Sequence, residues 1–273
     1  MPVRLAIAGA SGRMGQALIE AAIDAPDLAL AAALDVAGSP LLGRDAGERF
    51  GRPTGVRVAA DVAAAVSAAD VLIDFTRPAG TLAHVAACAA AGVAAVIGTT
   101  GFDDAGKAAL RAAGERIALV VAPNMSIGVN VLLELVRVAA QSLAGFDAEI
   151  LEMHHRHKVD APSGTALALG ESVAAGFGVP LAAHAVYARE GVTGERKPGA
   201  IGFATLRGGD VVGEHTVVFA GAGERIELAH KATSRQNFAS GALRAARFVA
   251  ARRAAGERGV FDMRDVLGLA PAR

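Results

Sequence analysis

The chain has 273 residues, which is enough for one large domain or for two of modest size, each able to bury a sizeable core. It carries 27 basic and 27 acidic side chains, and this formal charge of zero excludes a global field that would draw it to nucleic acid or to an anionic membrane. Apolar residues make up 53% of the chain, but no apolar run approaches the roughly 20 residues needed to span a bilayer. We therefore expect no nucleic-acid partner and no membrane partner.

The single cysteine and the amino terminus bear on the cellular compartment. Cys88 excludes an intramolecular disulfide framework, and its setting between alanines is that of a small residue packed on a helix. The first residues lack the basic region, the long apolar segment and the cleavage site of a signal peptide. These features predict a soluble cytoplasmic protein.

A glycine-rich turn follows the first apolar run of the chain. Val3 to Ala8 is typical of a buried parallel strand, and it leads into Gly9-Ala-Ser-Gly12-Arg-Met-Gly15 and a helical stretch from Gln16 to Ala25. Because glycines let the backbone approach a pyrophosphate at a helix N-terminus, this context predicts a dinucleotide site. The spacing is Gly-x-x-Gly-x-x-Gly, not the strict Gly-x-Gly-x-x-Gly, so a tight strand-to-helix connection of any α/β protein is the alternative.

An acidic residue stands where a ribose-binding acid is expected. The apolar run from Leu28 to Leu34 ends at Asp35, about 20 residues after the last glycine of the turn. An ordinary loop residue after a strand is the alternative for Asp35 alone. An enzyme that prefers the 2′-phosphorylated cofactor often has an arginine next to this acid, but this chain has Val36. The pattern favours use of NADH at least as much as NADPH, although Arg13 could partly compensate.

Strand-like and helix-like segments alternate over the first 120 or so residues, which argues for a helix-covered parallel sheet. The later predicted strands are Val71–Phe75, Val93–Ile97 and Ile117–Val121. Ligands collect outside the carboxyl ends of such strands. Phe75-Thr76-Arg77 and Gly98-Thr99-Thr100, which follow two of these strands, are therefore candidate cofactor contacts, and Ala122-Pro123-Asn124-Met125 follows the third strand at the same edge. We predict an α/β fold with a Rossmann-like nucleotide domain.

The second half of the chain has a different texture. Ser126 to Ala144 predicts an amphipathic helix, with Val131, Leu135 and Val138 at helical spacing, which could bridge two domains. A strand from Phe146 to Met153 and a helix from Gly164 to Gly176 are expected next. Three runs rich in β-branched residues then alternate with short glycine turns: Ile201–Arg207, Val211–Ala220 and Arg225–His230. Short turns favour antiparallel neighbours, so we predict an α+β domain with a mainly antiparallel sheet.

The predicted domains are discontinuous in sequence. A helix from Gln236 to Arg253 and the tail from Gly259 are expected to return to the first domain. We therefore assign residues 1–125 and 236–273 to the dinucleotide-binding domain and residues 126–235 to the second domain.

The segment from Glu152 to Ala166 concentrates groups that bind anions and move protons. It contains His154-His-Arg-His-Lys158, followed by Ser163-Gly-Thr165 at a predicted helix start. If this segment is extended, alternate side chains share a face, and a turn near Val159 and Asp160 could bring both sets around a small anion. Histidine titrates near neutrality and the pKa of a desolvated lysine falls, so a proton donor is available, while arginine and the hydroxyls of Ser163 and Thr165 would hold carboxylates.

Three other interpretations of this segment compete. A basic run is usually a solvated face, but three histidines among five residues do little for solubility. A metal site is disfavoured because Arg156 and Lys158 crowd the imidazoles, so no metal is expected. Nucleic-acid binding needs a broader basic surface with stacking aromatics, whereas this chain has one Tyr and no Trp. We favour an acid/base site that binds an anion.

Several motifs spread over almost the whole chain carry a family resemblance. They are Glu152-x-His-His-Arg-His-Lys-x-Asp-Ala-Pro-Ser-Gly-Thr-Ala, Gly9-Ala-Ser-Gly-Arg-Met-Gly, Asp74-Phe-Thr-Arg-Pro78, Ile97-Gly-Thr-Thr-Gly-Phe102, Gly194-Glu-Arg, Ile201-Gly-Phe-Ala and Phe261-Asp-Met-Arg-Asp265. In these motifs the chain resembles the bacterial 4-hydroxy-tetrahydrodipicolinate reductase (dihydrodipicolinate reductase) family. The resemblance implies NAD(P)H-dependent reduction, with loss of water, of the cyclic dicarboxylate formed from pyruvate and aspartate semialdehyde, in lysine and diaminopimelate biosynthesis.

The resemblance also implies site residues, cofactors and an assembly. His154 would be a proton donor and acceptor and Lys158 a proton donor, while His155, Gly164 and Thr165 would hold the substrate carboxylates. NADH or NADPH would contact Gly9, Ala10, Ser11, Gly12, Arg13, Met14, Asp35, Gly98, Thr99, Thr100, Ala122, Pro123, Asn124 and Met125. A homotetramer joined through the sheet of the second domain is implied as well.

Two other functions fit the same residues. A dehydrogenase acting on another small dicarboxylate or on a semialdehyde is possible because fold alone does not determine the substrate. A nucleotide-sensing binding module would bind the cofactor tightly and would cause no oxidation with any dicarboxylate.

Overall fold

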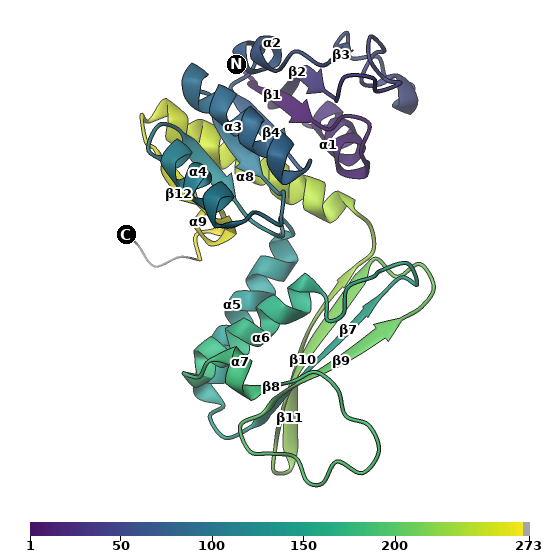
Figure 1. Ribbon diagram of the computed structural model, residues 1–273, viewed down its shortest axis with the longest axis vertical. Helices are drawn as coiled ribbons and strands as arrows, with labels where there is room; N and C mark the ends of the chain where they lie inside the picture. The colour runs from purple at the N-terminus through teal and green to yellow at the C-terminus, as the bar shows by residue number, and fades with distance from the viewer. Residues whose placement is uncertain (270–273) are drawn as a thin grey trace. The chain divides into compact units, whose positions relative to one another are not determined.

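The computed structural model describes residues 1–269, which form two compact units (Figure 1). Of the described residues, unit 1 contains 1–127 and 235–269, and unit 2 contains 128–234. Within residues 1–269 no helix combines the length and the apolar composition needed to cross a bilayer.

Unit 1 is built on a seven-stranded sheet in which every pairing is parallel. Its strands are β1 Val3–Ala8, β2 Leu28–Leu34, β3 Val58–Ala59, β4 Val71–Asp74, β5 Ala94–Ile97, β6 Ala118–Val121 and β12 Gly259–Phe261. They lie in the order β12-β6-β5-β4-β1-β2-β3, which is the strand order of dinucleotide-binding folds with one strand added at the edge. The predicted Rossmann-like domain is confirmed.

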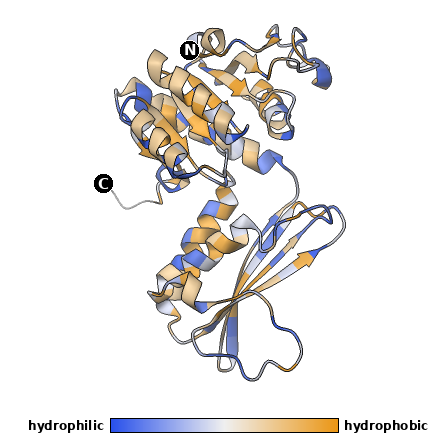
Figure 2. Ribbon diagram, in the orientation of Figure 1, coloured by the Kyte–Doolittle hydropathy of each residue, from blue (hydrophilic) through white to orange (hydrophobic). Residues whose placement is uncertain are grey.

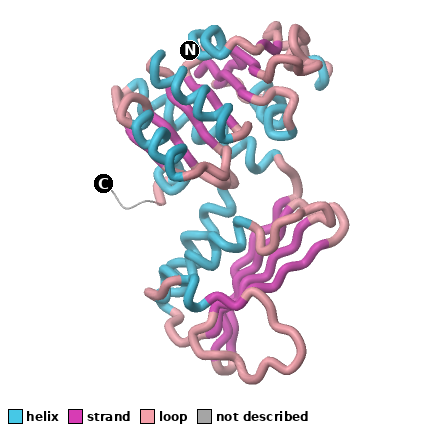
Figure 3. Tube along the Cα trace, in the orientation of Figure 1, coloured by secondary structure: helices cyan, strands magenta, loops and turns pink. Residues whose placement is uncertain are grey.

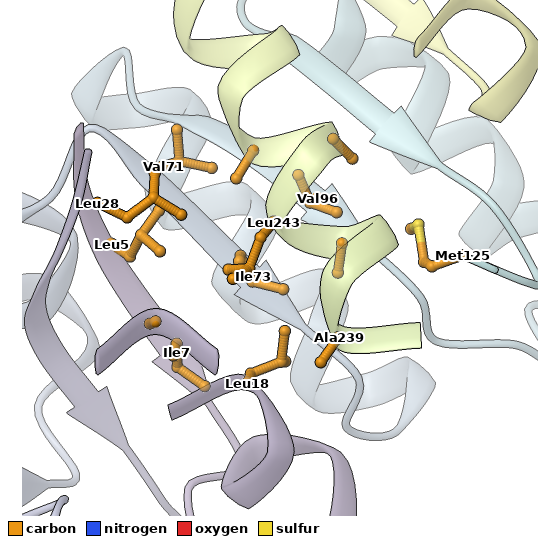
Figure 4. Packing of buried hydrophobic residues seen from close by; sticks show 14 of the residues in the cluster. Leu5, Ile7, Leu18, Leu28, Val71, Ile73, Val96, Met125, Ala239 and Leu243 are labelled. Carbon is orange, nitrogen blue, oxygen red and sulfur yellow. The ribbon is translucent and has the colours of Figure 1, made fainter. Parts of the chain in front are cut away.

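Helices cover both faces of this sheet because successive strand residues point to opposite sides. The helices are α1 Arg13–Ile23, α2 Val62–Ala68, α3 Pro78–Ala91, α4 Asp104–Gly114, α8 Gln236–Ala254 and α9 Met263–Leu267, with a 3-10 turn at Glu48–Phe50. Leu5 and Ile7 pack under α1 and α8 (Figure 4). Ala6 and Ala8 pack under α2, α3 and α4. The strands of this sheet are coloured as hydrophobic in Figure 2. Cys88 is fully buried on α3, and burial raises the pKa of its thiol to about 12.

The register of the sheet aligns the carboxyl ends of its strands. Ala8 at the end of β1 pairs with Leu34 on one side and with Asp74 on the other. Asp74 pairs in turn with Ile97, and Ile97 with Val121. The loops that follow β1, β2, β4, β5 and β6 therefore all begin at one edge of the sheet.

Unit 2 packs helices on one face of a five-stranded sheet (Figures 1 and 3). Its elements are α5 Ile127–Ser142, β7 Asp147–His154, α6 Gly164–Phe177, α7 Leu181–His184, β8 Ala185–Val186, β9 Ile201–Arg207, β10 Gly213–Gly221 and β11 Glu224–Ala232. The strand order is β11-β10-β7-β9-β8. β10 runs antiparallel to both of its neighbours, as predicted, while β9 is parallel to β7 and β8 is parallel to β9.

Two expectations for unit 2 differ from the structure. β9 and β10 are joined by a short turn, but they flank β7 instead of pairing with each other. The turn crosses the end of β7, where Gly208 N–H donates to the His154 carbonyl at 3.0 Å and His155 N–H donates to the Val211 carbonyl at 2.7 Å. The strand that carries the His-rich segment is consequently held from both sides.

The apolar stripe that we expected to be buried on α5 is partly exposed to solvent. Leu135 and Val138 are 51% and 47% exposed, and the buried residues of the helix are instead Val129, Asn130, Leu132, Val136 and Ala140. Apolar residues surround most of this helix, so more than one stripe fits a helical period. The sheet beneath determines which stripe is buried.

Candidate active site

Two positions of the glycine turn in unit 1, Gly9 and Gly15, require glycine for different reasons. Gly9 has a φ of +75°, in the left-handed region that favours glycine. A Cβ on Gly15 would overlap the carbonyl oxygen of Gly9, so this position lets α1 approach the end of β1 closely. Gly12 is the N-cap of α1 and supplies no side-chain cap. The first backbone N–H groups of the helix are therefore free of a side-chain acceptor from the N-cap residue.

Asp35 is tied to the glycine turn. Its carboxylate accepts hydrogen bonds from Ser11 N–H at 2.8 Å, from Val36 N–H at 2.8 Å and from the Ser39 hydroxyl at 3.1 Å. Burial alone would raise the pKa of Asp35, but these hydrogen bonds outweigh it and lower the pKa below its usual value. Asp35 is thus a fixed carboxylate beside the turn.

A buried carboxylate links the loops after β4 and β5. Asp74 is fully buried and accepts from Thr76 N–H at 2.7 Å and from the Thr81 hydroxyl at 3.1 Å, and its other oxygen lies 2.7 Å from His84 Nδ1. The hydroxyls of Thr81 and Thr99 are 2.8 Å apart. The predicted contact Thr99 is consequently held by α3, and the roles of Asp74 and His84 were not foreseen from the sequence.

The predicted cofactor contacts differ in what they can offer. Met125 is 1% exposed and its side chain lies in the core cluster beneath α8 (Figure 4). Ala10 and Ala122 are also buried, and Thr99 is 5% exposed. These residues can present little more than backbone or a hydroxyl, whereas Ser11, Gly12, Arg13, Thr100 and Pro123 are exposed. Gly9, Met14, Asp35, Gly98 and Asn124 are half-buried.

This edge of unit 1 fits a nicotinamide dinucleotide. The left-handed Gly9, the close approach at Gly15 and the N-terminus of α1 form the cradle that a pyrophosphate needs. Asp35 stands at the end of the neighbouring strand, where a ribose hydroxyl is recognised.

The His-rich segment of unit 2 begins on a strand face turned toward the helices. Along β7, Ala148, Ile150, Glu152 and His154 are buried in alternation. His154 Nδ1 lies 2.6 Å from Glu152 Oε2. Arg207 on β9 donates to both carboxylate oxygens of Glu152, at 2.8 and 2.9 Å. His154 and Arg207 are register partners, so the sheet itself brings these side chains together.

Beyond His154 the chain turns at once. The expected extended stretch ends with β7 at His154, and a turn closes where Lys158 N–H donates to the His155 carbonyl at 3.1 Å. The turn therefore comes before Val159 and Asp160, because the β9–β10 connection caps the end of β7. Arg156 is exposed, and the rings of His155 and His157 are 6.2 Å apart. His155 Nδ1 is buried without a hydrogen-bonding partner among residues 1–269.

Lys158 is linked to the same group of charges. Its ammonium donates to both carboxylate oxygens of Asp160, at 2.7 and 2.9 Å. Asp160 in turn accepts a hydrogen bond at its carbonyl from Arg207, at 2.6 Å. The guanidinium of Arg207 thus bridges the two carboxylate-bearing residues that contact His154 and Lys158.

The start of α6 is organised by Ser163, whose role differs from the expected one. Ser163 is 2% exposed and caps the helix by accepting from Ala166 N–H at 3.1 Å, so it is withdrawn from carboxylate binding. Its hydroxyl also lies 3.0 Å from His215 Nε2 on β10. Gly164 and Thr165 occupy the first two positions of α6, at the end where the helix dipole favours anions.

Burial and charge set the protonation of this group. Burial lowers the pKa of His154, against the opposing effect of Glu152, and the same cause lowers the pKa of His215 to about 4. Burial would raise the pKa of Glu152, but hydrogen bonds from Arg207, His154 and Ser163 lower it instead. The site therefore contains an ionised Glu152 beside two imidazoles that favour the neutral form.

Sequence reasoning missed Arg207 and His215 and gave Glu152 no role. Arg207 and His215 lie 55 and 63 residues beyond Glu152, and strand pairing brings them to one face of the sheet. The available signal was the period of two along β7, which places Glu152 and His154 side by side.

Comparisons with known proteins agree on one family. The profile of "Dihydrodipicolinate reductase, N-terminus" matches residues 3–125, and that of "Dihydrodipicolinate reductase, C-terminus" matches residues 128–267. This chain belongs to the dihydrodipicolinate reductase family. Relatives from Cupriavidus necator and Thiobacillus denitrificans, both described as 4-hydroxy-tetrahydrodipicolinate reductase, are each 60% identical and cover 98% of this chain and 100% of their own.

A solved structure of the family has the same fold. Dipicolinate-bound dihydrodipicolinate reductase from Paenisporosarcina sp. TG-14 superposes with a TM-score of 0.73 at 26% identity, over 96% of this chain and 98% of that chain. As a member of the family the protein is an oxidoreductase that reduces 4-hydroxy-tetrahydrodipicolinate in lysine biosynthesis, with a nicotinamide dinucleotide as cofactor.

The low pKa of His215 predicts a dependence of stability on pH. Between about pH 6.5 and about pH 4 the unfolded chain binds a proton at His215 that the folded chain does not, so the free energy of unfolding falls as the pH falls. The full effect is roughly 3 kcal/mol. In His215→Asn this component disappears, and urea unfolding followed by circular dichroism over this range should show a shallower loss of stability.

The matched control is the exposed His157, whose replacement by Asn should leave the pH dependence of wild type intact. An equally steep loss of stability in His215→Asn and wild type would contradict the assignment of this titration to His215.

Proposed function

We propose that unit 1 binds NADH or NADPH and that unit 2 binds the dicarboxylate substrate and moves its protons. The observation that carries the assignment of unit 2 is the group of Glu152, His154, Arg207 and Lys158 beside the N-terminus of α6. The solved relative from Paenisporosarcina sp. TG-14 is bound to dipicolinate, a planar ring with two carboxylates, which supports a dicarboxylate here. The proposed domains are residues 1–125 with 236–273, and residues 126–235.

The proposed contacts of the cofactor are the residues predicted from the strand ends of unit 1. When bound, the reduced nicotinamide supplies the hydride. Gly9 to Met14 hold the pyrophosphate through backbone N–H groups, and Asp35 accepts from a ribose hydroxyl. Gly98 to Thr100 and Ala122 to Met125 position the rest of the cofactor. The hydroxyl of Thr99 is oriented by Thr81 and Asp74.

In unit 2 the proposed roles divide between holding and proton transfer. His155 and the backbone of Gly164 and Thr165 hold the substrate carboxylates, since a helix N-terminus and an imidazole both donate hydrogen bonds to anions. His154 accepts and delivers a proton, and Lys158 donates one, which the ring and its departing hydroxyl require. The orphaned Nδ1 of His155 supports a role in binding, because a buried polar atom without a partner is costly.

The assembly and the compartment belong to the same proposal. The sheet face of unit 2 that α5 and α6 leave uncovered carries Leu151 and Leu206, which are 38% and 46% exposed. Burying such side chains against another copy is favourable, and we propose a homotetramer joined through this face. A cytoplasmic location, where thiols stay reduced, suits the buried Cys88.

Activity with both cofactors is the first test. Purified protein should oxidise NADH and NADPH when freshly generated 4-hydroxy-tetrahydrodipicolinate is supplied. Val36 is 73% exposed beside Asp35, so Val36→Arg should raise the ratio of kcat/KM for NADPH to that for NADH by about tenfold through contact with the 2′-phosphate.

Val192→Arg is the matched control, because Val192 is equally apolar and fully exposed in unit 2, and it should leave the cofactor ratio unchanged. Absence of oxidation with either cofactor, while another reductase of the family turns over in the same assay, would refute the proposed function.

Substitutions in the cationic segment test the proton roles. His154→Gln and Lys158→Ala should each lower kcat by roughly 100-fold to 10,000-fold, because each removes a group that transfers a proton. The affinity for NADH, measured by fluorescence titration, should stay close to that of wild type. His184→Gln and Lys231→Ala, which lie elsewhere in unit 2, should retain wild-type kcat. Unchanged kcat in His154→Gln or Lys158→Ala would remove the corresponding role.

Light scattering tests the assembly. Wild type should have the mass of four chains, and Leu151→Asp should shift it to smaller species because a carboxylate is placed in the proposed interface. Leu135→Asp introduces the same charge at the exposed face of α5 and should leave the tetramer intact. A monomeric wild type would exclude the tetramer.

A further inference from the structure

We propose that Glu152 is a positioning residue which holds His154 in the tautomer that carries its proton on Nδ1, so that Nε2 exchanges the proton during reduction. This inference rests on the proposed role of His154. It assigns a function to a carboxylate to which neither the resemblance nor the comparisons give one.

The geometry leaves His154 a single way to bond with Glu152. The contact joins His154 Nδ1 and Glu152 Oε2 at 2.6 Å, in a place where His154 is 9% and Glu152 2% exposed. A carboxylate oxygen can only accept a hydrogen bond, so Nδ1 must donate it. In a neutral imidazole the other nitrogen then has a lone pair, and Nε2 becomes the position that accepts a proton.

Three donors keep Glu152 in its ionised form. Arg207 donates to Oε1 at 2.9 Å and to Oε2 at 2.8 Å, and Ser163 N–H donates to Oε1 at 3.0 Å. A protonated Glu152 would lose the negative charge that pairs with the guanidinium of Arg207, and a proton on Oε1 would face the N–H groups of Arg207 and Ser163. The ionised form is therefore the one that the surroundings select, and the direction of the hydrogen bond from His154 follows from it.

A glycine of β10, Gly213, lies next to the other ring nitrogen of His154, Nε2. A Cβ on Gly213 of β10 would lie 3.0 Å from Nε2, so a larger residue there would crowd this atom. The ring of His215 meets that of His154 edge-on, with centroids 5.1 Å apart. The lack of a side chain at Gly213 thus avoids crowding of Nε2, as a proton-exchanging atom requires.

Glu152 also couples the proton site to the proposed carboxylate site. Glu152 Oε1 accepts a hydrogen bond from Ser163 N–H, and Ser163 is the residue that caps α6. The same carboxylate therefore orients His154 and the first turn of α6, where Gly164 and Thr165 are proposed to hold the substrate. Loss of Glu152 should therefore disturb both the tautomer of His154 and the first turn of α6.

Several charged groups act on His154 at once. Glu152 favours the protonated imidazole, while Lys158 and Arg207 and the burial of the ring disfavour it, and His215 approaches from β10. Asp160 compensates Lys158 across the turn. Removing the charge of Glu152 therefore takes away the group that favours the protonated imidazole and makes His154 harder to protonate.

The deciding variant is Glu152→Gln, which keeps the shape of the side chain. An amide has one acceptor oxygen and one NH2 group. The Oε1 side receives two N–H donors, from Arg207 and Ser163, whereas the Oε2 side receives one N–H of Arg207 and faces His154, so the amide oxygen is favoured on the Oε1 side. The NH2 group is then placed against His154 Nδ1 and donates to it, which moves the proton of the ring to Nε2. We expect kcat to fall by about 100-fold or more, because the atom that must accept the proton is already protonated.

The tautomer can be measured without any turnover. Protein labelled with ring-15N histidine, with the His154 signals identified by their absence in His154→Gln, should show a protonated Nδ1 and an unprotonated Nε2 in wild type at neutral pH. Glu152→Gln should exchange the two. In the pH profile of kcat/KM, the limb that reports protonation of His154 should move to more acidic pH in Glu152→Gln.

Glu149→Gln is the matched control. Glu149 lies on the opposite face of the same strand and pairs with the guanidinium groups of Arg189 and Arg196, in the long loop after β8 (Figure 3). Its replacement also removes a carboxylate that is paired with arginine, and it should leave kcat and the tautomer of His154 as in wild type. Glu152→Asp retains the charge and should recover part of the kcat that Glu152→Gln loses.

The outcomes separate this inference from the proposed function. A His154 that is protonated on Nε2 in wild type, or a Glu152→Gln variant with wild-type tautomer and kcat, would overturn the role of Glu152 even if His154→Gln is inactive. If instead His154→Gln keeps full activity, the proposed role of His154 itself is lost, whatever the tautomer. Circular dichroism confirms that each variant compared is folded.

Discussion

The buried carboxylate of Glu152 is the constraint on which the site of unit 2 depends. A carboxylate that is 2% exposed is stable only if its charge is compensated and its oxygens accept hydrogen bonds. Here the compensation comes from a strand neighbour, a helix cap and a side chain two residues along the same strand. The sheet register, the start of α6 and the turn after β7 must all be correct together before this carboxylate can be buried.

Unit 1 differs from unit 2 in how its candidate site is built. Its candidate cofactor edge is built mainly from backbone, with glycines where the chain must turn to the left or approach another segment closely. Its buried carboxylate, Asp74, binds hydroxyls and a backbone N–H of the surrounding loops. A cradle built mainly from backbone suits a large cofactor that is recognised along its length, whereas a small dicarboxylate must be recognised by charge.

Local patterns explain which features the sequence could predict. The strands of unit 1, the glycine turn, Asp35 and the helix after Ser163 are encoded by neighbouring residues, so they could be read directly. The buried stripe of α5 could not, because its apolar residues fit two faces and the packing partner decides between them. The placement of β7 between β9 and β10 depends on pairing between segments about 60 residues apart, which no local pattern contains.

The same reasoning applies to the site residues. The cluster from His154 to Lys158 is conspicuous because it is contiguous, and it led directly to the candidate site. Arg207 and His215 are single residues in ordinary strands, and only the register of the sheet places them beside His154 and Glu152. Ser163 illustrates the reverse error, since a hydroxyl that suggested ligand binding is consumed by capping its own helix.

The balance of charge in the segment suits both of its proposed roles, the binding of a dianion and the release of protons. The carboxylates of the buried Glu152 and the exposed Asp160 are matched by Arg207 and Lys158, so the group that surrounds His154 is close to neutral before any anion arrives. A neutral His154 is easily kept in such a setting, and burial favours it further. Two substrate carboxylates would add negative charge and stabilise the protonated imidazole, since an opposite charge nearby favours the charged form. Binding of the dicarboxylate would thereby raise the pKa of His154, the residue that we propose delivers the proton.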